Sequence, residues 1–148
     1  MLLAIDIGNT NIVAGVFDGP ALSRSWRIGT KLDRTADEYA LVLSGLYSAT
    51  ERIRRVSQAV LSSVVPPLEA VLAEAVFRSF GVSAELVKAG WKTGLRIDID
   101  RPDELGADRL VNAAAAFRRF GGPLVVVDFG TATTFCAVTA DGVYKGGA

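Results

Sequence analysis

The order of apolar and polar positions along the chain predicts strands that alternate with helices. Apolar runs at residues 2–7 and 12–17 are separated by the tight turn "GNTN", and a third run with rough alternation follows at 21–28. Short apolar runs bounded by turn residues are typical of strands. Three more strands are expected further on, at residues 56–64, 84–89 and 95–99. Interspersed with helical segments, these strands favour an α/β protein.

Helix signals occur in three segments. The sequence "TADE" at residues 35–38 is a capping box, in which the threonine caps the helix and the glutamate reaches back, and this helix is expected to run through about Glu51. Residues 66–80 open on two prolines and are followed by a glycine, as helices often are. The alanine-rich segment at 103–120 has high helix propensity and precedes Gly-Gly-Pro.

The end of the chain repeats its beginning. The opening "LLAIDIGNTNIVAGVFDG" lies along the later "LVVVDFGTATTFCAVTADG", with one residue inserted in the second copy. Asp6 then falls on Asp128, and Gly8 falls on Gly130. Internal duplication predicts two similar lobes. We expect residues 1–123 to form an N-terminal lobe and residues 124–148 to be the first hairpin of a second, truncated lobe.

The balance of charge argues against two classes of partner. The 148 residues carry 16 basic and 16 acidic side chains and no basic run, so neither nucleic acid nor an anionic membrane is expected as a partner. Charges or turn residues interrupt every apolar run before it reaches membrane-spanning length. The single cysteine, Cys136, excludes an intrachain disulfide, and a core position is expected for it. A reducing, cytoplasmic location fits this composition.

The absence of histidine from these residues limits the possible chemistry. It excludes Ser-His-Asp and Cys-His catalysis and nearly every zinc site. Carboxylates, hydroxyls, lysine, arginine, backbone amides and hard cations remain. Phosphoryl transfer needs no more than these, because positioning and electrostatics do most of the catalysis.

The repeated strand-Asp-x-Gly turn has two interpretations. Asp, Gly and Asn form turns for backbone reasons alone. The occurrence of two copies favours binding, because glycine lets the backbone approach a ligand and successive N–H groups bind anions. Asp6 and Asp128 would repel phosphate, so Mg²⁺ is expected between carboxylate and polyphosphate. The side chains that would donate to phosphate oxygens are Asn9, Thr10, Thr131, Thr133 and Thr134.

The segment "RPDELGADRL" also has two interpretations. As a simple helix start, it places acidic residues at the positive end of the helix dipole. The alternative notes that Gly106 lies in the expected first turn, where glycine destabilises a helix, so that close approach of a substrate would explain it. Asp108 would then act as a base towards a hydroxyl group, and Arg109 as an anchor for a carboxylate or amide.

Three motifs, "DIGNTN", "RPDELGADR" and "DFGTATT", occur in this order along the chain. Because it carries these three motifs in this order, the sequence resembles the type III pantothenate kinases of the acetate kinase, sugar kinase, Hsp70 and actin superfamily. The resemblance implies a ribonuclease H-like, actin-type ATPase fold, with a mixed sheet flanked by helices. It also implies ATP-dependent phosphorylation of pantothenate to 4'-phosphopantothenate, the first step of coenzyme A biosynthesis, by a homodimer.

The resemblance assigns a role to individual residues. Asp108 becomes the proton acceptor and Asp128 a ligand of a monovalent cation (potassium or ammonium), while Mg²⁺ at Asp6 stays the expectation drawn above from the motif itself. The family often carries a tyrosine at the position of Ile99, so the contacts to pantothenate are expected to differ there. The ATP-binding residues are Asp6, Ile7, Gly8, Asn9, Thr10, Asn11, Ile12, Val13 and Thr131. The substrate-binding residues are Ile99, Gly106, Ala107, Asp108 and Arg109.

Two other functions are compatible with the same motifs. One is a different small-molecule kinase or phosphatase of the superfamily, acting on acetate, a sugar or polyphosphate. The other is a non-catalytic regulator that resembles the Bvg accessory factor. Because the family continues into a second lobe, we expect residues 1–148 alone to be inactive or weakly active and to associate with another copy.

Overall fold

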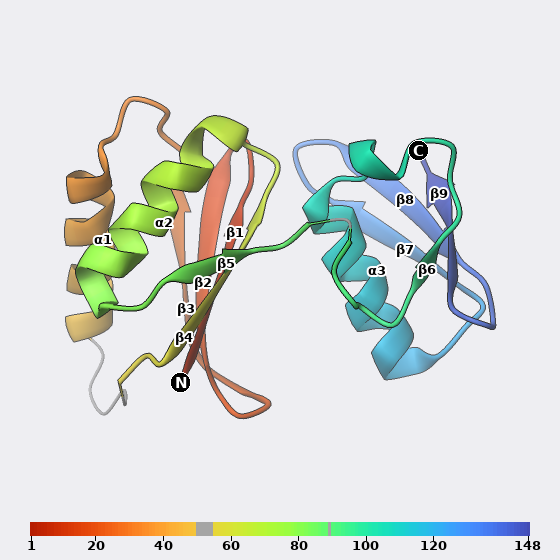
Figure 1. Cartoon of the computed structure of the whole chain (residues 1–148), viewed down its shortest axis with the longest axis horizontal. Coiled ribbons are helices and arrows are strands. Elements are labelled where there is room, and N and C mark those ends of the chain that lie inside the picture. The colour runs from red at the N-terminus through yellow and green to blue at the C-terminus, as the bar shows by residue number, and fades with distance from the viewer. Residues whose placement is uncertain (50–54, 89) are drawn as a thin grey trace. The chain divides into compact units, whose positions relative to one another are not determined.

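The computed structural model describes residues 1–49, 55–88 and 90–148. The chain divides into two compact units, Met1–Val87 and Lys88–Ala148 (Figure 1). Each unit has its own sheet and its own apolar core. The division at Val87 differs from the lobe boundary expected at residue 124, and the assignment of residues 124–148 to a duplicated lobe stays a prediction.

The first unit is built on a five-stranded mixed sheet, in the order β3-β2-β1-β4-β5. Strands β1, β2 and β3 are antiparallel neighbours, whereas β1, β4 and β5 run parallel. Helix α1 follows β3 and leads into β4, and α2 connects β4 to its parallel neighbour β5, which a short hairpin turn cannot do. The elements are β1 (Leu2–Ile7), β2 (Asn11–Asp18), β3 (Ala21–Gly29), α1 (Ala36–Ser48), β4 (Gln58–Ser63), α2 (Pro66–Phe80) and β5 (Ala84–Leu86).

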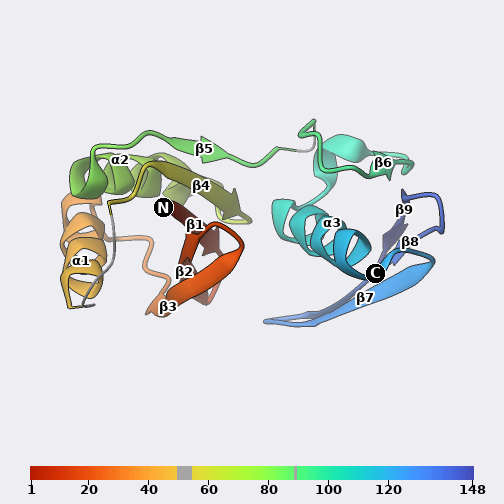
Figure 2. The ribbon, with the colours of Figure 1, turned by 90° about the horizontal axis from the view of Figure 1, so that it is seen from below.

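One face of this sheet forms the core. Along β1, Leu3, Ile5 and Ile7 are buried, whereas Asp6 between them is exposed. The two helices lie on the same side of the sheet (Figure 2), and the residues buried between helices and strands form one apolar cluster. Asp6 therefore points to the opposite face, because successive side chains of a strand alternate between its two faces.

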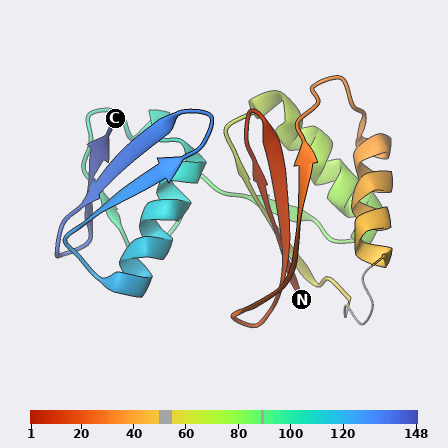
Figure 3. The ribbon, with the colours of Figure 1, turned by 180° about the vertical axis from the view of Figure 1, so that it is seen from behind.

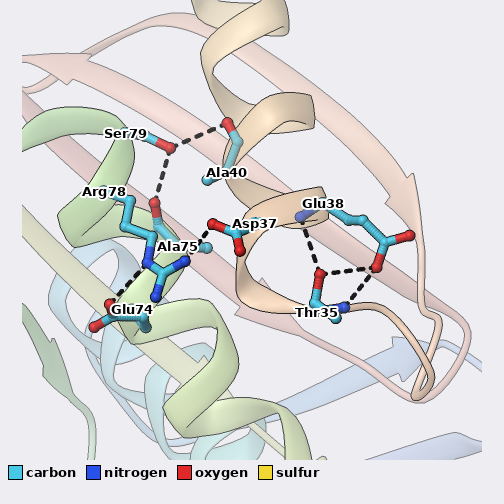
Figure 4. A network of polar contacts seen from close by, with 8 residues as sticks. All are labelled: Thr35, Asp37, Glu38, Ala40, Glu74, Ala75, Arg78 and Ser79. Carbon is cyan, nitrogen blue, oxygen red and sulfur yellow. Dashed lines mark hydrogen bonds and ion pairs between the residues drawn. The ribbon is translucent and has the colours of Figure 1, made fainter.

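Helix α1 begins with the expected capping box. The Thr35 backbone amide donates to Glu38 Oε2 (2.8 Å), and the Glu38 amide donates to Thr35 Oγ1 (3.3 Å; Figure 4). Two hydrogen bonds from Thr35 hold the pKa of the Glu38 carboxyl below its ordinary value. The bond from the Thr35 backbone amide has the larger effect, and the bond from its side chain the smaller. The capping-box prediction is confirmed. The helix ends at Ser48, and Glu51, where its end was expected, lies outside the described residues.

Polar contacts join α1 to α2 (Figure 4). Arg78 on α2 forms an ion pair with Asp37 of α1 and bonds Glu74 through Nε (2.8 Å). Ser79 Oγ donates to the Ala40 carbonyl of α1 (3.2 Å). Helix α2 spans residues 66–80, as expected, and the residue that caps its C-terminus is Gly81, whose φ of 66° is left-handed. The ion pairs are exposed, so buried apolar side chains contribute most of the attraction between the helices.

The second unit is a four-stranded sheet, in the order β6-β9-β8-β7, with one α-helix packed on it. Helix α3 packs against β7 and β8, which lie in front of it in Figure 3. None of the helices in the described part of the chain has the length and hydropathy to cross a membrane. The elements are β6 (Arg96–Ile97), the 3₁₀ helix η1 (Pro102–Glu104), α3 (Ala107–Phe120), β7 (Leu124–Phe129), β8 (Thr133–Val138) and β9 (Val143–Gly147).

The structure corrects the expected start of the third helix. Residues 102–104 form η1, and α3 begins only at Ala107. Gly106 is the N-cap, with φ of −58° and ψ of 137°, so it lies before the helix rather than in its first turn. The argument that Gly106 weakens the helix is therefore wrong, because an N-cap residue has non-helical backbone angles.

The repeated sequence forms the same local structure twice. Strands β1-β2-β3 and β7-β8-β9 are each an antiparallel meander. The expected final hairpin is confirmed, and β9 extends it; this strand was not expected because it is short and glycine-rich. The first turn closes from the Gly8 amide to the Asn11 carbonyl (3.0 Å), and its counterpart closes from Gly130 to Ala132 (3.2 Å). The second turn is thus one residue shorter.

Candidate functional site

The turn after β1 is held by bonds from its own backbone and from Thr30. Thr30 Oγ1 donates to the Gly8 carbonyl (2.7 Å), and the Thr30 amide donates to the Thr10 carbonyl (3.0 Å). A Cβ atom on Gly8 would lie 2.9 Å from the Asn11 carbonyl oxygen, closer than side chains allow. Glycine is therefore required at this position. The backbone amide of Asn9 takes no part in these bonds, and the Asn9 side chain is exposed.

The residues expected to bind ATP differ in whether their side chains are exposed to a ligand or buried in the core. Ile7 and Ile12 are fully buried in the first core, so they support the turn from behind and present no exposed group. Asp6, Asn9 and Thr10 are exposed. The turn thus offers a carboxylate, an amide side chain and a hydroxyl beside backbone N–H groups. This combination suits a phosphate bound through a hard cation. The remaining members of the set, Asn11 and Val13, are half-buried positions of β2.

In the second unit, Asp108 and Arg109 lie in the first turn of α3, directly after Ala107. Asp108 Oδ1 accepts a hydrogen bond from the Arg109 backbone amide (2.7 Å). This bond fixes one carboxylate oxygen and leaves Oδ2 for another donor. Both side chains are half-buried, and no side chain caps the helix at Gly106. The Arg109 guanidinium group and the helix-start amides without a side-chain cap suit an anionic group of a ligand, whereas the Asp108 carboxylate suits a hydroxyl donor.

Asn112 connects this helix to Asp128. Its Nδ2 donates to Asp128 Oδ2 across 3.1 Å. Asn112 follows Asp108 by four residues, which places both on one face of α3. Asp128 is half-buried on the side of β7 that faces the helix, whereas its neighbours Val127 and Phe129 are exposed on the other face. Asp108 and Asn112 thus lie on one face of α3, and Asn112 joins this face to Asp128.

The sequence analysis missed Asn112. The available signal was its place as the one uncharged polar side chain in "LVNAAAA", four residues after the expected base. An asparagine in an alanine-rich helix lowers helix propensity, so it indicates a role outside the helix itself.

Tyr144 of β9 is a buried phenol whose pKa is influenced by Arg109. The tyrosine is 1% exposed, and its hydroxyl donates to Cys136 Sγ (3.3 Å). Burial, reinforced by the Cys136 contact, raises the pKa of Tyr144 to about 12, and the Arg109 side chain acts in the opposite direction. Arg109 is thus close enough to interact with the phenol. Cys136 is buried in the second core, as expected for a structural cysteine.

Two further expected site residues of the second unit lie outside α3 and β7. Ile99 follows β6 and packs against the second core. Thr131 is exposed in the turn between β7 and β8. The Asp128 carboxylate lies beside Gly130, since Oδ1 is 4.0 Å from the place a Gly130 Cβ would take. Thr131 therefore lies in the turn that directly follows the strand carrying the carboxylate expected to bind a cation.

The expected residues form two groups. Asp6 to Val13 lie together in the first unit, and the residues from Ile99 onwards lie in the second. Within the described residues, no three Asp, Glu, Cys or His side chains gather to hold a metal ion. A cation at Asp6 or Asp128 would therefore take its other ligands from water, backbone or phosphate oxygens. The individual roles of these residues stay predictions.

Comparisons with known proteins identify the family. The model of the family described as type III pantothenate kinase matches residues 2–148. The type III pantothenate kinase of Anaeromyxobacter sp. (strain K) is 52% identical over 149 residues, and that of Moorella thermoacetica is 47% identical over 150. Each match covers 100% of this chain, and the chain spans 59% of the length of either relative.

A solved structure supports the fold. The ethanolamine utilization protein EutJ from Carboxydothermus hydrogenoformans superposes with a TM-score of 0.57 at 18% identity, covering 99% of this chain and 50% of that one. The expected actin-type α/β fold is confirmed. Because the family model covers the chain almost from end to end, this chain belongs to the type III pantothenate kinase family.

Proposed function

We propose that the full-length protein phosphorylates pantothenate to 4'-phosphopantothenate with ATP, the first step of coenzyme A biosynthesis, as a cytoplasmic homodimer. Family membership over residues 2–148 supports this proposal. The observation that carries it is the polar face of α3 in the second unit, where Asp108 and Arg109 lie in the first turn and Asn112 bonds Asp128. Phosphorylation of an alcohol needs a carboxylate near the acceptor hydroxyl and positive charge near the anionic groups.

Asp108 accepts the proton of the pantothenate hydroxyl as the bond to phosphorus forms. A carboxylate is too weak a base to ionise an alcohol beforehand, so its contribution comes in the transition state. Arg109 anchors the carboxylate or an amide of pantothenate, together with the backbone of Gly106 and Ala107. Ile99 lines the substrate site where the family often has a tyrosine, and makes an apolar contact there instead of a hydroxyl bond.

The turn from Asp6 to Val13 holds the phosphates of ATP, and Thr131 makes a further contact to the nucleotide. Asp6 holds Mg²⁺, mostly through water, and Asp128 holds potassium or ammonium. Both carboxylates fit these ions because hard cations prefer oxygen ligands, and Asp6 is exposed to receive one. When bound, Mg²⁺ neutralises the charge of the phosphate oxygens.

The test is ADP release by the full-length protein, with the product identified by mass spectrometry. We expect turnover that requires pantothenate and a product heavier by one phosphoryl group. Turnover with acetate, a sugar or polyphosphate instead would assign another activity of the superfamily. Absence of turnover with every compound of this panel would favour the non-catalytic regulator. Light scattering on the same sample measures whether the protein is a dimer.

A further inference from the structure

Ser62 on β4 is a buried hydroxyl without a structural partner. Its side chain is 7% exposed, and Oγ has no hydrogen-bond partner among the described residues. Buried hydroxyl groups are nearly always hydrogen-bonded, because an unpaired one loses its bonds to water without replacement. An exception of this kind calls for an explanation in terms of a group that binds there.

The position of Ser62 in the sheet points to such a group. Strands β1 and β4 are parallel, and their register pairs Asp6 with Ser62. Leu61, the residue before Ser62, is buried in the apolar cluster with the helices, as are Ile5 and Ile7 on either side of Asp6. Ser62 and Asp6 therefore project side by side from the opposite face. Both lie one residue before the carboxyl ends of their strands, where ligands of α/β sheets bind.

The next residue, Ser63, shows what a structural serine does here. Its Oγ accepts a hydrogen bond from the Val65 amide (3.0 Å), at the turn that leads into α2. Ser63 is thus explained by the local backbone. Ser62 has no such bond, although the two side chains have the same chemistry.

We propose that Ser62 is a positioning residue for the divalent cation that Asp6 holds: its hydroxyl hydrogen-bonds a water molecule bound to the cation. A hydroxyl can both donate and accept, whereas the Asp6 carboxylate only accepts, so the pair can orient a hydrated ion that one carboxylate alone would leave free to turn. A small, strongly hydrated ion that keeps several waters is the ligand this arrangement suits. This inference rests on the proposed function, since the cation enters with ATP.

The test compares Ser62→Ala with the matched control Ser63→Ala in the full-length protein. Isothermal titration calorimetry measures ATP affinity with Mg²⁺ and with a chelator, and thermal unfolding measures the stability of the ligand-free protein. We expect Ser62→Ala to leave the affinity for metal-free ATP unchanged and to weaken Mg²⁺–ATP binding by about tenfold. The ligand-free variant should melt at the same temperature or higher, because an unpaired buried hydroxyl has been removed.

Ser63→Ala should do the reverse, lowering the melting temperature and leaving the effect of Mg²⁺ on ATP affinity unchanged. The inference is overturned if Ser62→Ala binds Mg²⁺–ATP as tightly as the parent, or if it lowers the melting temperature as Ser63→Ala does. In either case, a parent that still phosphorylates pantothenate leaves the proposed function standing. A parent whose ATP binding is indifferent to Mg²⁺ and which does not turn over pantothenate overturns both.

Discussion

Asn112 and Asp128 are joined by a hydrogen bond of 3.1 Å that links helix α3 to strand β7. The bond is charge-assisted, because it runs from an amide to a carboxylate, and such bonds are stronger than neutral ones. It fixes one oxygen of the carboxylate expected to bind a monovalent cation. Asn112 thereby sets the orientation of Asp128, in the way that residues behind a metal ligand orient that ligand.

We predict that Asn112→Ala raises the potassium concentration needed for half-maximal activity by about threefold to tenfold. Activity at saturating potassium should fall much less. Asp128→Ala should remove the response to potassium altogether. The measurement is pantothenate kinase activity against potassium concentration. Arg118→Ala, an exposed change on the same helix, serves as control and should titrate like the parent. An Asn112→Ala titration that overlays the parent would contradict this role.

Asp108→Asn should lower phosphoryl transfer by roughly a hundredfold to ten-thousandfold, the usual contribution of a general base. ATP affinity should stay near that of the parent, since Asp108 is expected to bind the pantothenate hydroxyl and not the nucleotide. Single-turnover kinetics and a nucleotide-binding titration measure the two effects. Asp103→Asn, on the exposed 3₁₀ helix, is the matched control and should be fully active. Near-normal turnover of Asp108→Asn would return this residue to the role of a helix-start carboxylate.

Gly8→Ala should both destabilise the first unit and weaken nucleotide binding. The new methyl group would lie 2.9 Å from the Asn11 carbonyl oxygen, so the turn must open. Overpacking of this kind lowers the free energy of unfolding by about 1–3 kcal/mol. Gly29→Ala is the control, because no atom lies within 4 Å of its added Cβ. Urea unfolding and ATP titration of both variants check the prediction, which fails if the two behave alike.

The raised pKa of Tyr144 predicts a loss of stability in alkali. The native phenol titrates at about 12, whereas in the unfolded chain it titrates near its ordinary value of 10.0. The contribution of Tyr144 to the free energy of unfolding is therefore intact below pH 10. It is lost as the pH rises towards 12, because only the unfolded chain releases the phenol proton in that window. Between about pH 10 and 12, the parent should lose more unfolding free energy than Tyr144→Phe. Equal losses in the two proteins would contradict it.

Local signals in the sequence were sufficient for most of the fold. The capping box at Thr35, the prolines at the start of α2 and the left-handed Gly81 act through neighbouring backbone, so they could be recognised without any tertiary information. The start of α3 could not be recognised from neighbouring residues alone. Asp103 and Glu104 suit the beginning of a helix, but the structure places them in a 3₁₀ helix that ends before Gly106. Several short elements were compatible with those residues, and packing decided between them.

The candidate site likewise contains residues that the sequence alone could identify and residues that it could not. Asp6, Asp108 and Asp128 lie in recognisable motifs, whereas Asn112 and Ser62 matter through partners distant in sequence. Asn112 meets Asp128 only because α3 packs on β7, and Ser62 lies beside Asp6 only because β4 pairs in parallel with β1. Strand register and helix packing are tertiary properties, and no spacing within either segment reveals them.

The shorter turn at Gly130 means that the two copies of the repeat are no longer interchangeable. Two residues past the glycine, Thr10 lies inside the first turn, whereas Ala132 in the second copy supplies the carbonyl that closes the turn. Equivalent positions in the aligned sequences therefore have different backbone surroundings. A substitution tolerated in one copy has no reason to be tolerated in the other.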